Sequence, residues 1–224
     1  MIIDEAQARA WIATLPQADA TAIDRLERLA VLLADENARQ NLVSSASLSE
    51  VWRRHVADSA QLLTHVPHET LAGPWLDLGT GAGFPGLVIA CLAPDLELTM
   101  VESRAKRIDW LSRAAESLGL TRATVAGSRL ERVEARPFSV ISARAFAPLA
   151  TLLDLSARFS TSATTWLLPK GRSARHELDE LSGWHHVFHV EQSLTDPEGG
   201  IIVGTLSGKT GAGWQNRQKG APIA

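Results

Sequence analysis

Apolar residues recur at helical spacing through the first part of the chain. Residues 4–15 and 19–38 predict two helices, and a capping box at Ser47-Leu48-Ser49-Glu50 predicts a third helix that runs to about Val66. The apolar stripe of the second helix is formed by Ile23, Leu26, Ala30 and Leu33. Because such a stripe has to be buried, we expect these helices to cover a face of a sheet formed by the rest of the chain.

From residue 75 onward, short apolar runs alternate with helical patterns. The runs predict strands at 75–78, 96–102, 123–126, 138–142, 164–168, 184–190 and 201–206. The segments between them predict helices at 85–93, 104–118, 148–158 and 173–182. Turns are expected at Pro169-Lys170-Gly171-Arg172 and at 196–200. Strands that alternate with helices are typical of a parallel sheet.

The pattern therefore predicts an α/β fold with a mostly parallel seven-stranded sheet and helices on both of its faces. Residues 1–68 are expected to form an N-terminal helical extension packed on a core of residues 69–206. Residues 207–224 are rich in Gly, Lys and Gln and are expected to form a mobile tail.

The stretch that follows the first predicted strand is rich in glycine: Gly79-Thr80-Gly81-Ala82-Gly83-Phe84-Pro85-Gly86. Glycine is selected where the backbone takes positive φ or where a ligand approaches the main chain, here at a helix N-terminus. Glu102, at the end of the second strand, stands where such folds place the acid that accepts from a ribose hydroxyl. The stretch predicts a site for a nucleoside-containing cofactor, and the alternative is a glycine-rich turn that binds nothing.

Two classes of cofactor fit these glycines. Residues 81–86 satisfy the dinucleotide pattern G-x-G-x-x-G, which alone is a weak signal. Asp77 argues against a dinucleotide, because a carboxylate two residues before the first glycine would repel a pyrophosphate, whereas it suits a ligand that carries an ammonium group and a sulfonium. The pattern Asp77-x-Gly79-x-Gly81-x-Gly83 resembles the first motif of class I methyltransferases that depend on S-adenosylmethionine.

Composition fits a globular protein of the reducing cytoplasm. The chain has 224 residues, of which 45% are hydrophobic and 21% charged. No apolar run reaches the length of a membrane span, and the acidic start Met1-Ile2-Ile3-Asp4-Glu5 does not resemble a signal peptide. The single cysteine, Cys91, has no partner within the chain for a disulfide. The seven histidines of the chain are scattered, so we expect no metal site. We also expect a monomer.

The formal net charge of −3 hides a local excess of cations. Residues 100–145 carry nine basic side chains against five acidic ones. The basic residues are Arg104, Lys106, Arg107, Arg113, Arg122, Arg129, Arg132, Arg136 and Arg144. Such a face could hold a phosphate backbone, and the alternative is an ordinary solvated surface. Lys106, Arg107, Lys170 and Arg172 are our candidates for phosphate contacts.

The residues after the fourth predicted strand restrict the atom that could receive a methyl group. Methylation at pyrimidine C5 usually requires a cysteine on a loop, and Cys91 lies within a predicted helix. Methylation of exocyclic amines is commonly marked by an Asn/Asp-Pro-Pro-aromatic loop, and residues 142–146 read Ser-Ala-Arg-Ala-Phe instead. Guanine N7 has a free lone pair and no proton to lose, so it needs no general base. An unpaired guanine of RNA would expose that atom.

Further candidates lie beyond the glycines. His55 and Asp58 are three residues apart on the third predicted helix and can neighbour one another; the pair would serve acid–base chemistry or a structural hydrogen bond. Leu130 and Glu131 follow the third strand, where they could meet an adenine ring. Arg144 follows the fourth strand and could orient the carboxylate of a methyl donor or a guanine.

Several of these motifs together resemble one family, that of ribosomal RNA small subunit methyltransferase G, also called glucose-inhibited division protein B. The motifs are Asn41-Leu42-Val43-Ser44, Arg54-His55-x-x-Asp58-Ser59, Asp77 to Gly86, Glu102-Ser103-x-x-Lys106-Arg107, Arg144-Ala145 and Lys170-Gly171. The resemblance covers about residues 25–206. It implies a Rossmann-like class I fold and N7-methylation of one guanine, position 527, in the 530 loop of bacterial 16S rRNA. It also implies cofactor contacts at Gly79, Phe84, Leu130, Glu131 and Arg144.

The expected roles follow from this resemblance and from the motifs. Gly79, Gly81 and Gly83 give S-adenosylmethionine close access to the backbone, Asp77 helps to hold its methionine end, Glu102 takes its ribose, and Phe84 and Leu130 wall the pocket. His55, Asp58 and Arg144 are expected to position the target, which is 16S rRNA or a small ribosomal subunit particle. Rival interpretations are a methyltransferase for small molecules, an NAD-binding oxidoreductase, and a cofactor-binding module without catalysis.

Overall fold

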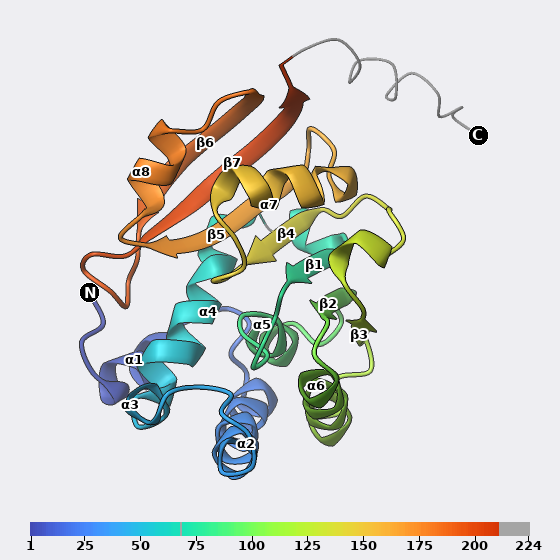
Figure 1. Ribbon diagram of the computed structural model, residues 1–224. Coiled ribbons are helices and arrows are strands. Elements are labelled where there is room, and N and C mark those ends of the chain that lie inside the picture. Colours follow the sequence, from blue (N-terminus) through green and yellow to red (C-terminus); the bar gives the residue numbers. More distant parts are fainter. Residues whose placement is uncertain (68, 211–224) are drawn as a thin grey trace.

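The computed structural model describes residues 1–67 and 69–210, and one twisted sheet runs through their centre (Figure 1). Its strands lie in the order β3-β2-β1-β4-β5-β7-β6. Their bounds are β1 Trp75–Leu78, β2 Leu98–Glu102, β3 Ala123–Gly127, β4 Val140–Ala143, β5 Thr165–Gly171, β6 Trp184–Gln192 and β7 Gly200–Lys209. Pairing is parallel from β3 to β5, and β7 runs antiparallel to both of its neighbours. The predicted mostly parallel seven-stranded α/β fold is therefore confirmed.

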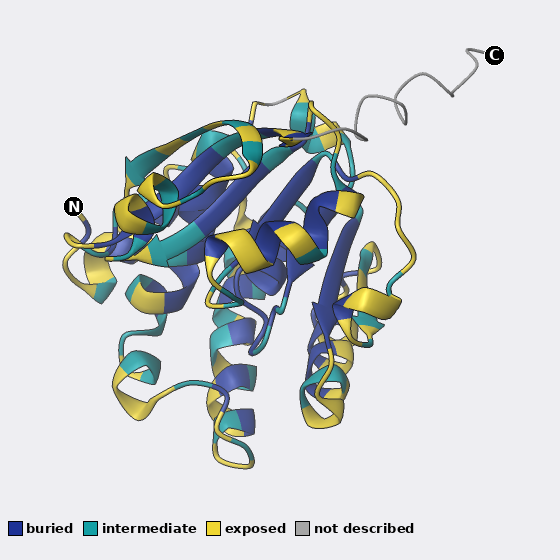
Figure 2. Cartoon of the chain, turned by 45° about the horizontal axis from the view of Figure 1, so that its top comes forward, coloured by how far each residue is buried: buried dark blue, intermediate teal, exposed yellow. Residues whose placement is uncertain are grey.

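Helices cover both faces of this sheet. The α-helices of the described residues are α1 Glu5–Ile12, α2 Ala20–Asn37, α3 Ser45–Leu48, α4 Asp58–Ala60, α5 Gly86–Leu92, α6 Ala105–Ser117, α7 Leu149–Ser156 and α8 Ala174–Asp179. Successive strand residues point to opposite faces, so Trp75 joins the apolar cluster of α5 and α6, and Leu76 joins that of α7. The central strands are consequently buried between two layers (Figure 2). None of the helices in the described part of the chain is long and apolar enough to cross a membrane.

The N-terminal helices form a further layer on one face. Asp4 and Asp19 cap α1 and α2 by accepting from Gln7 N and Ala22 N. The buried stripe of α2 contains Leu26, Leu29 and Leu33, with the predicted Ile23 and Ala30 half-buried beside it. These leucines share a single apolar cluster with α5 and α6. The sheet is thus covered by α5 and α6, and α2 packs outside them (Figure 1).

The prediction of one continuous third helix from Ser47 to Val66 is wrong, both in where the helix starts and in its continuity. The cap is Ser44, whose hydroxyl accepts from Ser47 N, and α3 ends at Leu48. The carboxylate of Glu5 accepts from Trp52 N at 3.0 Å and Arg53 N at 2.8 Å. Because a distant side chain takes these two amides, the helical ladder breaks and restarts as a π-helical segment Trp52–Ala57, followed by α4 and a 3₁₀ segment Gln61–His65.

Two predictions near the end of the sheet also need correction. Residues 169–171 were expected in a turn, yet they continue β5, with a shift of register between Pro169 and Gly171. Proline is tolerated there because β4 pairs with β5 only as far as Leu167, which leaves the Pro169 edge free on that side. Strand β7 continues to Lys209, three residues past the predicted end of the core. Residues 211–224 of the predicted tail lie outside the described residues.

Candidate functional site

The glycine-rich loop joins β1 to α5 at the carboxyl edge of the sheet. Gly79, Gly81 and Gly83 have φ values of +63°, +60° and +103°, a region that residues with side chains rarely adopt. A Cβ at Gly83 would lie 2.4 Å from Cδ1 of Leu87, so packing as well as conformation requires glycine there. The loop presents backbone at the start of α5, as the sequence predicted.

The carboxylate of Asp77 supports this loop through hydrogen bonds. Its Oδ2 accepts from Gly86 N at 3.0 Å, and its Oδ1 accepts from the Ser142 hydroxyl at 2.7 Å. The Ser142 oxygen accepts in turn from Trp75 Nε1 at 2.9 Å. Asp77 has 0% of its surface exposed, and this burial raises the pKa of its carboxyl to about 6. The side chain is enclosed by protein groups, so a direct contact with the methionine end of a donor stays a prediction.

A cleft of about 400 Å³, here called the glycine-loop cleft, opens beside Gly79. Its lining brings together four predicted cofactor residues, which are Gly79, Glu102, Leu130 and Glu131. Glu102 is 7% exposed; its Oε1 accepts from the amides of Ser103 and Arg104, and its Oε2 lies 3.8 Å from Nη1 of Arg107. Leu130 is buried and Glu131 is exposed on a 3₁₀ turn.

A second cleft of about 750 Å³, the Arg144 cleft, adjoins the first. It is lined by residues of the segments 44–58, 144–148, 169–177 and 193–201. Ala145 and Phe146 line both clefts, so the loop that follows β4 separates them. His55 and Asp58, which the sequence placed on the target side, line the second cleft, and so does Arg144, for which the sequence left the donor carboxylate and the guanine open.

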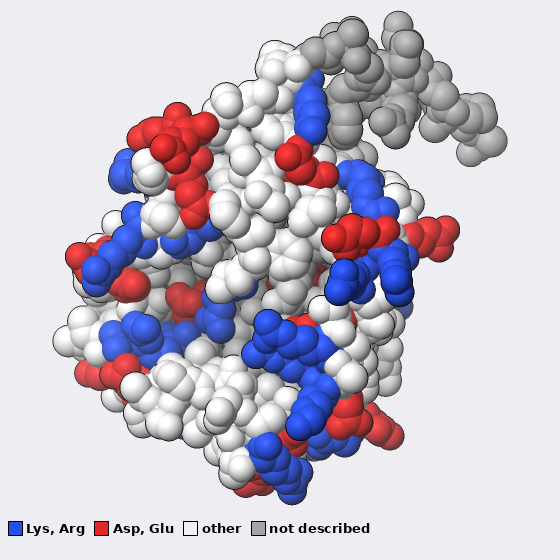
Figure 3. All heavy atoms as spheres, viewed as in Figure 1, with Lys and Arg blue, Asp and Glu red and all other residues white. Residues whose placement is uncertain are grey.

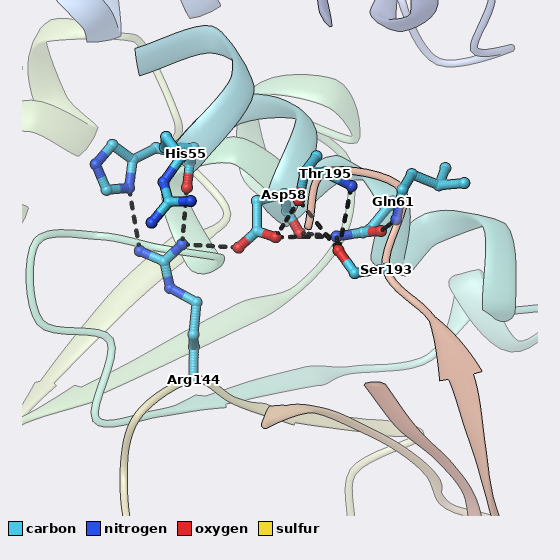
Figure 4. A network of polar contacts seen from close by, with 8 residues as sticks. His55, Asp58, Gln61, Arg144, Ser193 and Thr195 are labelled. Atoms are coloured by element: carbon cyan, nitrogen blue, oxygen red, sulfur yellow. Dashed lines mark hydrogen bonds and ion pairs between the residues drawn. The ribbon is translucent and has the colours of Figure 1, made fainter. Parts of the chain in front are cut away.

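Arg144 is held there by the N-terminal region (Figure 4). Its Nη1 lies 3.0 Å from Oδ2 of Asp58, and its Nη2 lies 3.3 Å from Nδ1 of His55. Oδ1 of Asp58 accepts from the Thr195 hydroxyl at 2.7 Å and from Gln61 Nε2 at 3.0 Å. Asp58 therefore joins Arg144 to the loop between β6 and β7, and Arg144 lines the second cleft but not the glycine-loop cleft.

His55 is a neutral group in this arrangement. Burial, with the nearby positive charge of Arg144, lowers the pKa of its imidazole to about 3. Arg144 only donates, so Nδ1 of His55 accepts and the proton resides on Nε2. The ring of Phe84 stacks on that of His55, with the ring centroids 4.7 Å apart. Phe84 is 3% exposed and lies behind His55, outside the linings of both clefts, so its contact with a cofactor stays a prediction.

Comparison with known proteins shows which family the chain belongs to. A sequence model described as GidB, rRNA small subunit methyltransferase G, matches residues 22–195. The chain belongs to that family. It is 57% identical over 211 residues to Ribosomal RNA small subunit methyltransferase G of Erythrobacter litoralis (strain HTCC2594), covering 94% of this chain and 100% of that protein.

A second relative agrees with this family, and a solved structure agrees with the fold. Ribosomal RNA small subunit methyltransferase G of Novosphingobium aromaticivorans is 54% identical, with 97% of this chain and 96% of that protein covered. The crystal structure of a mutant of MtNAS in complex with S-adenosylmethionine has a TM-score of 0.52 at 16% identity, covering 91% of this chain and 84% of that one. At such low identity the likeness concerns the fold, and it agrees with a Rossmann-like core.

The four cations that we proposed from the sequence for phosphate contacts differ from one another in exposure and in ion pairing. Lys106 is exposed and Arg107 is partly covered beside Glu102. Arg172 is exposed and ion-paired with Glu198. The side chain of Lys170 is 8% exposed; its Nζ lies 2.9 Å from Oε2 of Glu177 and donates to Ala147 O. Lys170 therefore points into the protein and holds the loop after β4.

Three further arginines line the two clefts. Arg54 lines the Arg144 cleft, and Arg104 and Arg129 line the glycine-loop cleft. All three are exposed, and within the described part of the chain none of them forms an ion pair. Figure 3 shows basic side chains on both sides of a hollow in this face. Arg104 and Arg129 belong to the basic excess seen in the sequence, and Arg54 belongs to the motif before His55.

Other residues of the site gave no sequence signal. Thr195 donates to Asp58 across 137 residues, and Gln61, three residues from Asp58, also contacts Ser193 and Leu194 across more than 130 residues. Nothing in the local sequence of residues 193–195 predicts these contacts. Phe146, between the two clefts, was read only as part of a loop that lacks an amine-methylation motif. In the described residues, no group of three or more His, Cys, Asp or Glu side chains is arranged to hold a metal ion.

Proposed function

We propose that this protein transfers a methyl group from S-adenosylmethionine to N7 of guanine 527, in the 530 loop of bacterial 16S rRNA. Membership of the rRNA small subunit methyltransferase G family supports the reaction and the class of substrate. The observation that carries the proposal is the pair of adjoining clefts, one beside the glycine loop and one beside Arg144, which share Ala145 and Phe146 as a common wall.

The glycine-loop cleft is proposed as the donor site. Its volume of about 400 Å³ lies in the range of small-ligand pockets. Backbone at Gly79 would face the donor, Oε2 of Glu102 would accept from a ribose hydroxyl, and Leu130 and Glu131 would meet the adenine. Asp77 supports these contacts by holding Gly86 and Ser142. S-adenosylmethionine supplies an electrophilic methyl group on a sulfonium.

The Arg144 cleft is proposed as the target site. Arg144 lines this cleft and not the glycine-loop cleft, so we assign it to the guanine rather than to the carboxylate of the donor. Arg donates naturally to guanine O6. Asp58 and His55 fix the orientation of Arg144. A histidine with a pKa of about 3 is a very weak base, which suits a nucleophile that has no proton to lose. Positioning N7 in line with the methyl group is then the main requirement.

The RNA contacts are proposed for the cations on the rims of both clefts. Lys106 and Arg107 remain candidates, together with Arg54, Arg104 and Arg129, while Arg172 would have to leave Glu198. The partner is 16S rRNA or a small ribosomal subunit particle. We further propose that the protein acts as a monomer in the cytoplasm, without a metal, and that residues 1–68 form an extension of the core.

The test is methylation of small ribosomal subunits from cells that lack the gene. The purified protein and S-adenosylmethionine are added, the rRNA is cleaved chemically at N7-methylguanine, and primer extension locates the break. A stop at guanine 527 that depends on both additions is expected. No stop there, or transfer only to free nucleosides, would contradict the proposal and favour a small-molecule methyltransferase. A melting temperature raised by NADH and not by S-adenosylmethionine would favour an oxidoreductase.

A further inference from the structure

The loop between β4 and α7 is fixed at both ends and projects one aromatic side chain, that of Phe146. At one end Arg144 is bound to Asp58 and His55. At the other end Lys170 donates to Ala147 O, and Oε2 of Glu177 accepts from Leu149 N at 2.7 Å. Between these anchors the backbone turns at Ala145, whose φ of 51° is in the left-handed region. Such conformations concentrate where a side chain has to be aimed at a functional site.

The ring of Phe146 lies at the junction of the two clefts. It lines both of them and rests on Gly79, where an added Cβ would lie 2.4 Å from Cδ2 of the ring. The side chain is half-buried, so part of its surface is accessible. A methyl group that passes from the glycine-loop cleft to the Arg144 cleft has to cross beside this ring.

The Arg144 cleft offers few aromatic faces. Unpaired RNA bases are commonly held by stacking on aromatic rings. The chain contains no tyrosine, and the residues that line this cleft include two rings, His55 and Phe146. One face of His55 is covered by Phe84, and His55 is only 6% exposed. Phe146 is therefore the lining residue with a ring face to offer.

We propose that Phe146 stacks on the target guanine and holds its N7 in line with the methyl group at the junction of the clefts. This role rests on the proposed function, because it assumes an RNA base in the Arg144 cleft. It adds a residue that contacts the substrate, beside Arg144 at the edge of the base. The stack transfers no proton and needs no further reactant.

The experiment compares Phe146→Leu, Phe146→Ala and Phe146→Tyr with the wild type. Methyl transfer to small subunits from gene-deleted cells gives kcat/KM for the RNA, and calorimetry gives the Kd of S-adenosylhomocysteine. Loss of one stack is expected to lower kcat/KM by about 5- to 150-fold in Phe146→Ala. Phe146→Leu, which keeps the bulk without the π face, should fall at least about fivefold, and Phe146→Tyr should stay within about threefold. The Kd of the donor product should change less than about threefold in Phe146→Leu and Phe146→Tyr, because both keep the side-chain bulk that lines the donor cleft.

The outcomes separate the stacking role from its alternatives. Wild-type kcat/KM in Phe146→Leu would overturn stacking while leaving the proposed function intact. A loss of donor affinity parallel to the loss of kcat/KM in Phe146→Leu, which keeps the bulk that walls the donor cleft, would also overturn it, because the aromatic ring would then act on the donor rather than on the base. If the wild type itself transfers nothing to 16S rRNA, the proposed function fails and this inference fails with it. Equal melting temperatures show that the variants are folded.

Discussion

Ionisation of Asp77 is unfavourable in the folded protein, because its carboxylate has no exposed surface. Hydrogen bonds from Ser142 and Gly86 only partly replace water, so burial raises the pKa from 3.8 to about 6. The folded protein therefore binds a proton at Asp77 more tightly than the unfolded chain does. Between pH 3.8 and about 6 this residue makes folding less favourable as pH rises, and the full cost is present above that range.

The variant Asp77→Asn tests this pH dependence. Asparagine does not titrate, so the stability of the wild type relative to Asp77→Asn should fall by up to about 3 kcal/mol between pH 4 and pH 7. Urea unfolding at a series of pH values measures it, and all other titrating groups cancel in the difference. A difference that is constant with pH, or that grows in favour of the wild type, would contradict a raised pKa at Asp77.

Glu102 carries the ribose assignment, and the geometry allows a conservative test. Oε1 is used by Ser103 N and Arg104 N, so Glu102→Gln can keep this local structure through its amide oxygen. The charge and the second acceptor are lost, and donor affinity should weaken by about 1–3 kcal/mol. Calorimetric titration with S-adenosylmethionine measures it. The control is Glu116→Gln on the exposed side of α6, which should bind as the wild type does. Equal affinity of Glu102→Gln and the wild type would remove the ribose role.

At the scale of elements, Lys170 joins β5 to the loop that carries Phe146. Glu177 on α8 accepts from Lys170, Ser173 and Leu149. Burial raises the pKa of Glu177, but these hydrogen bonds outweigh it and lower the pKa below its usual value. A lysine used in this way positions the loop and has little freedom to reach a phosphate.

The salt dependence of RNA binding separates the two kinds of cation. Lys170→Met should lower the free energy of unfolding by about 1–3 kcal/mol, since it leaves a partly buried carboxylate without its cation, and it should keep the salt slope of RNA binding. Arg104→Ala should keep stability and reduce the slope of log K against log[salt] by about 0.7, the value for one contact to single-stranded RNA. Filter binding at several salt concentrations and urea unfolding measure the two effects. A reduced slope in Lys170→Met would restore the phosphate role predicted from sequence.

Elements fixed by local sequence could be predicted, and those fixed by distant contacts could not. Strands and helices were placed to within a few residues because apolar periodicity is local, and the glycine loop and Glu102 lie within one βαβ unit. The helix expected at 47–66 failed because Glu5, more than 45 residues away, takes the amides of Trp52 and Arg53. The Arg144 cleft was only partly predictable, because Asp58 meets Arg144 and Thr195 at separations of 86 and 137 residues. Contacts of that kind are fixed by the fold and leave no spacing in the sequence.

At the scale of the whole molecule, the N-terminal helices are tied to the far end of the chain. Ile2 N donates to Leu194 O, Leu194 N donates to Oε1 of Gln61, and the Thr195 hydroxyl donates to Asp58, each at 2.7 Å. The leucines of α2 also share one apolar cluster with α5 and α6. Separate unfolding of the extension would break the polar links and expose this cluster. The extension and the core should therefore unfold together.

Scanning calorimetry tests this cooperativity. We expect one transition whose calorimetric and van't Hoff enthalpies agree, as for a single two-state unit. Thr195→Val removes a donor to Asp58 and should lower the Tm by about 2–8 °C without splitting the transition. Thr121→Val, at an exposed position after α6, is the matched control and should leave the Tm unchanged. Two transitions in the wild type, or a first transition that moves alone in Thr195→Val, would mean that the N-terminal helices are a separate unit. Arg144 would then be oriented by a part of the protein that can detach from the donor site.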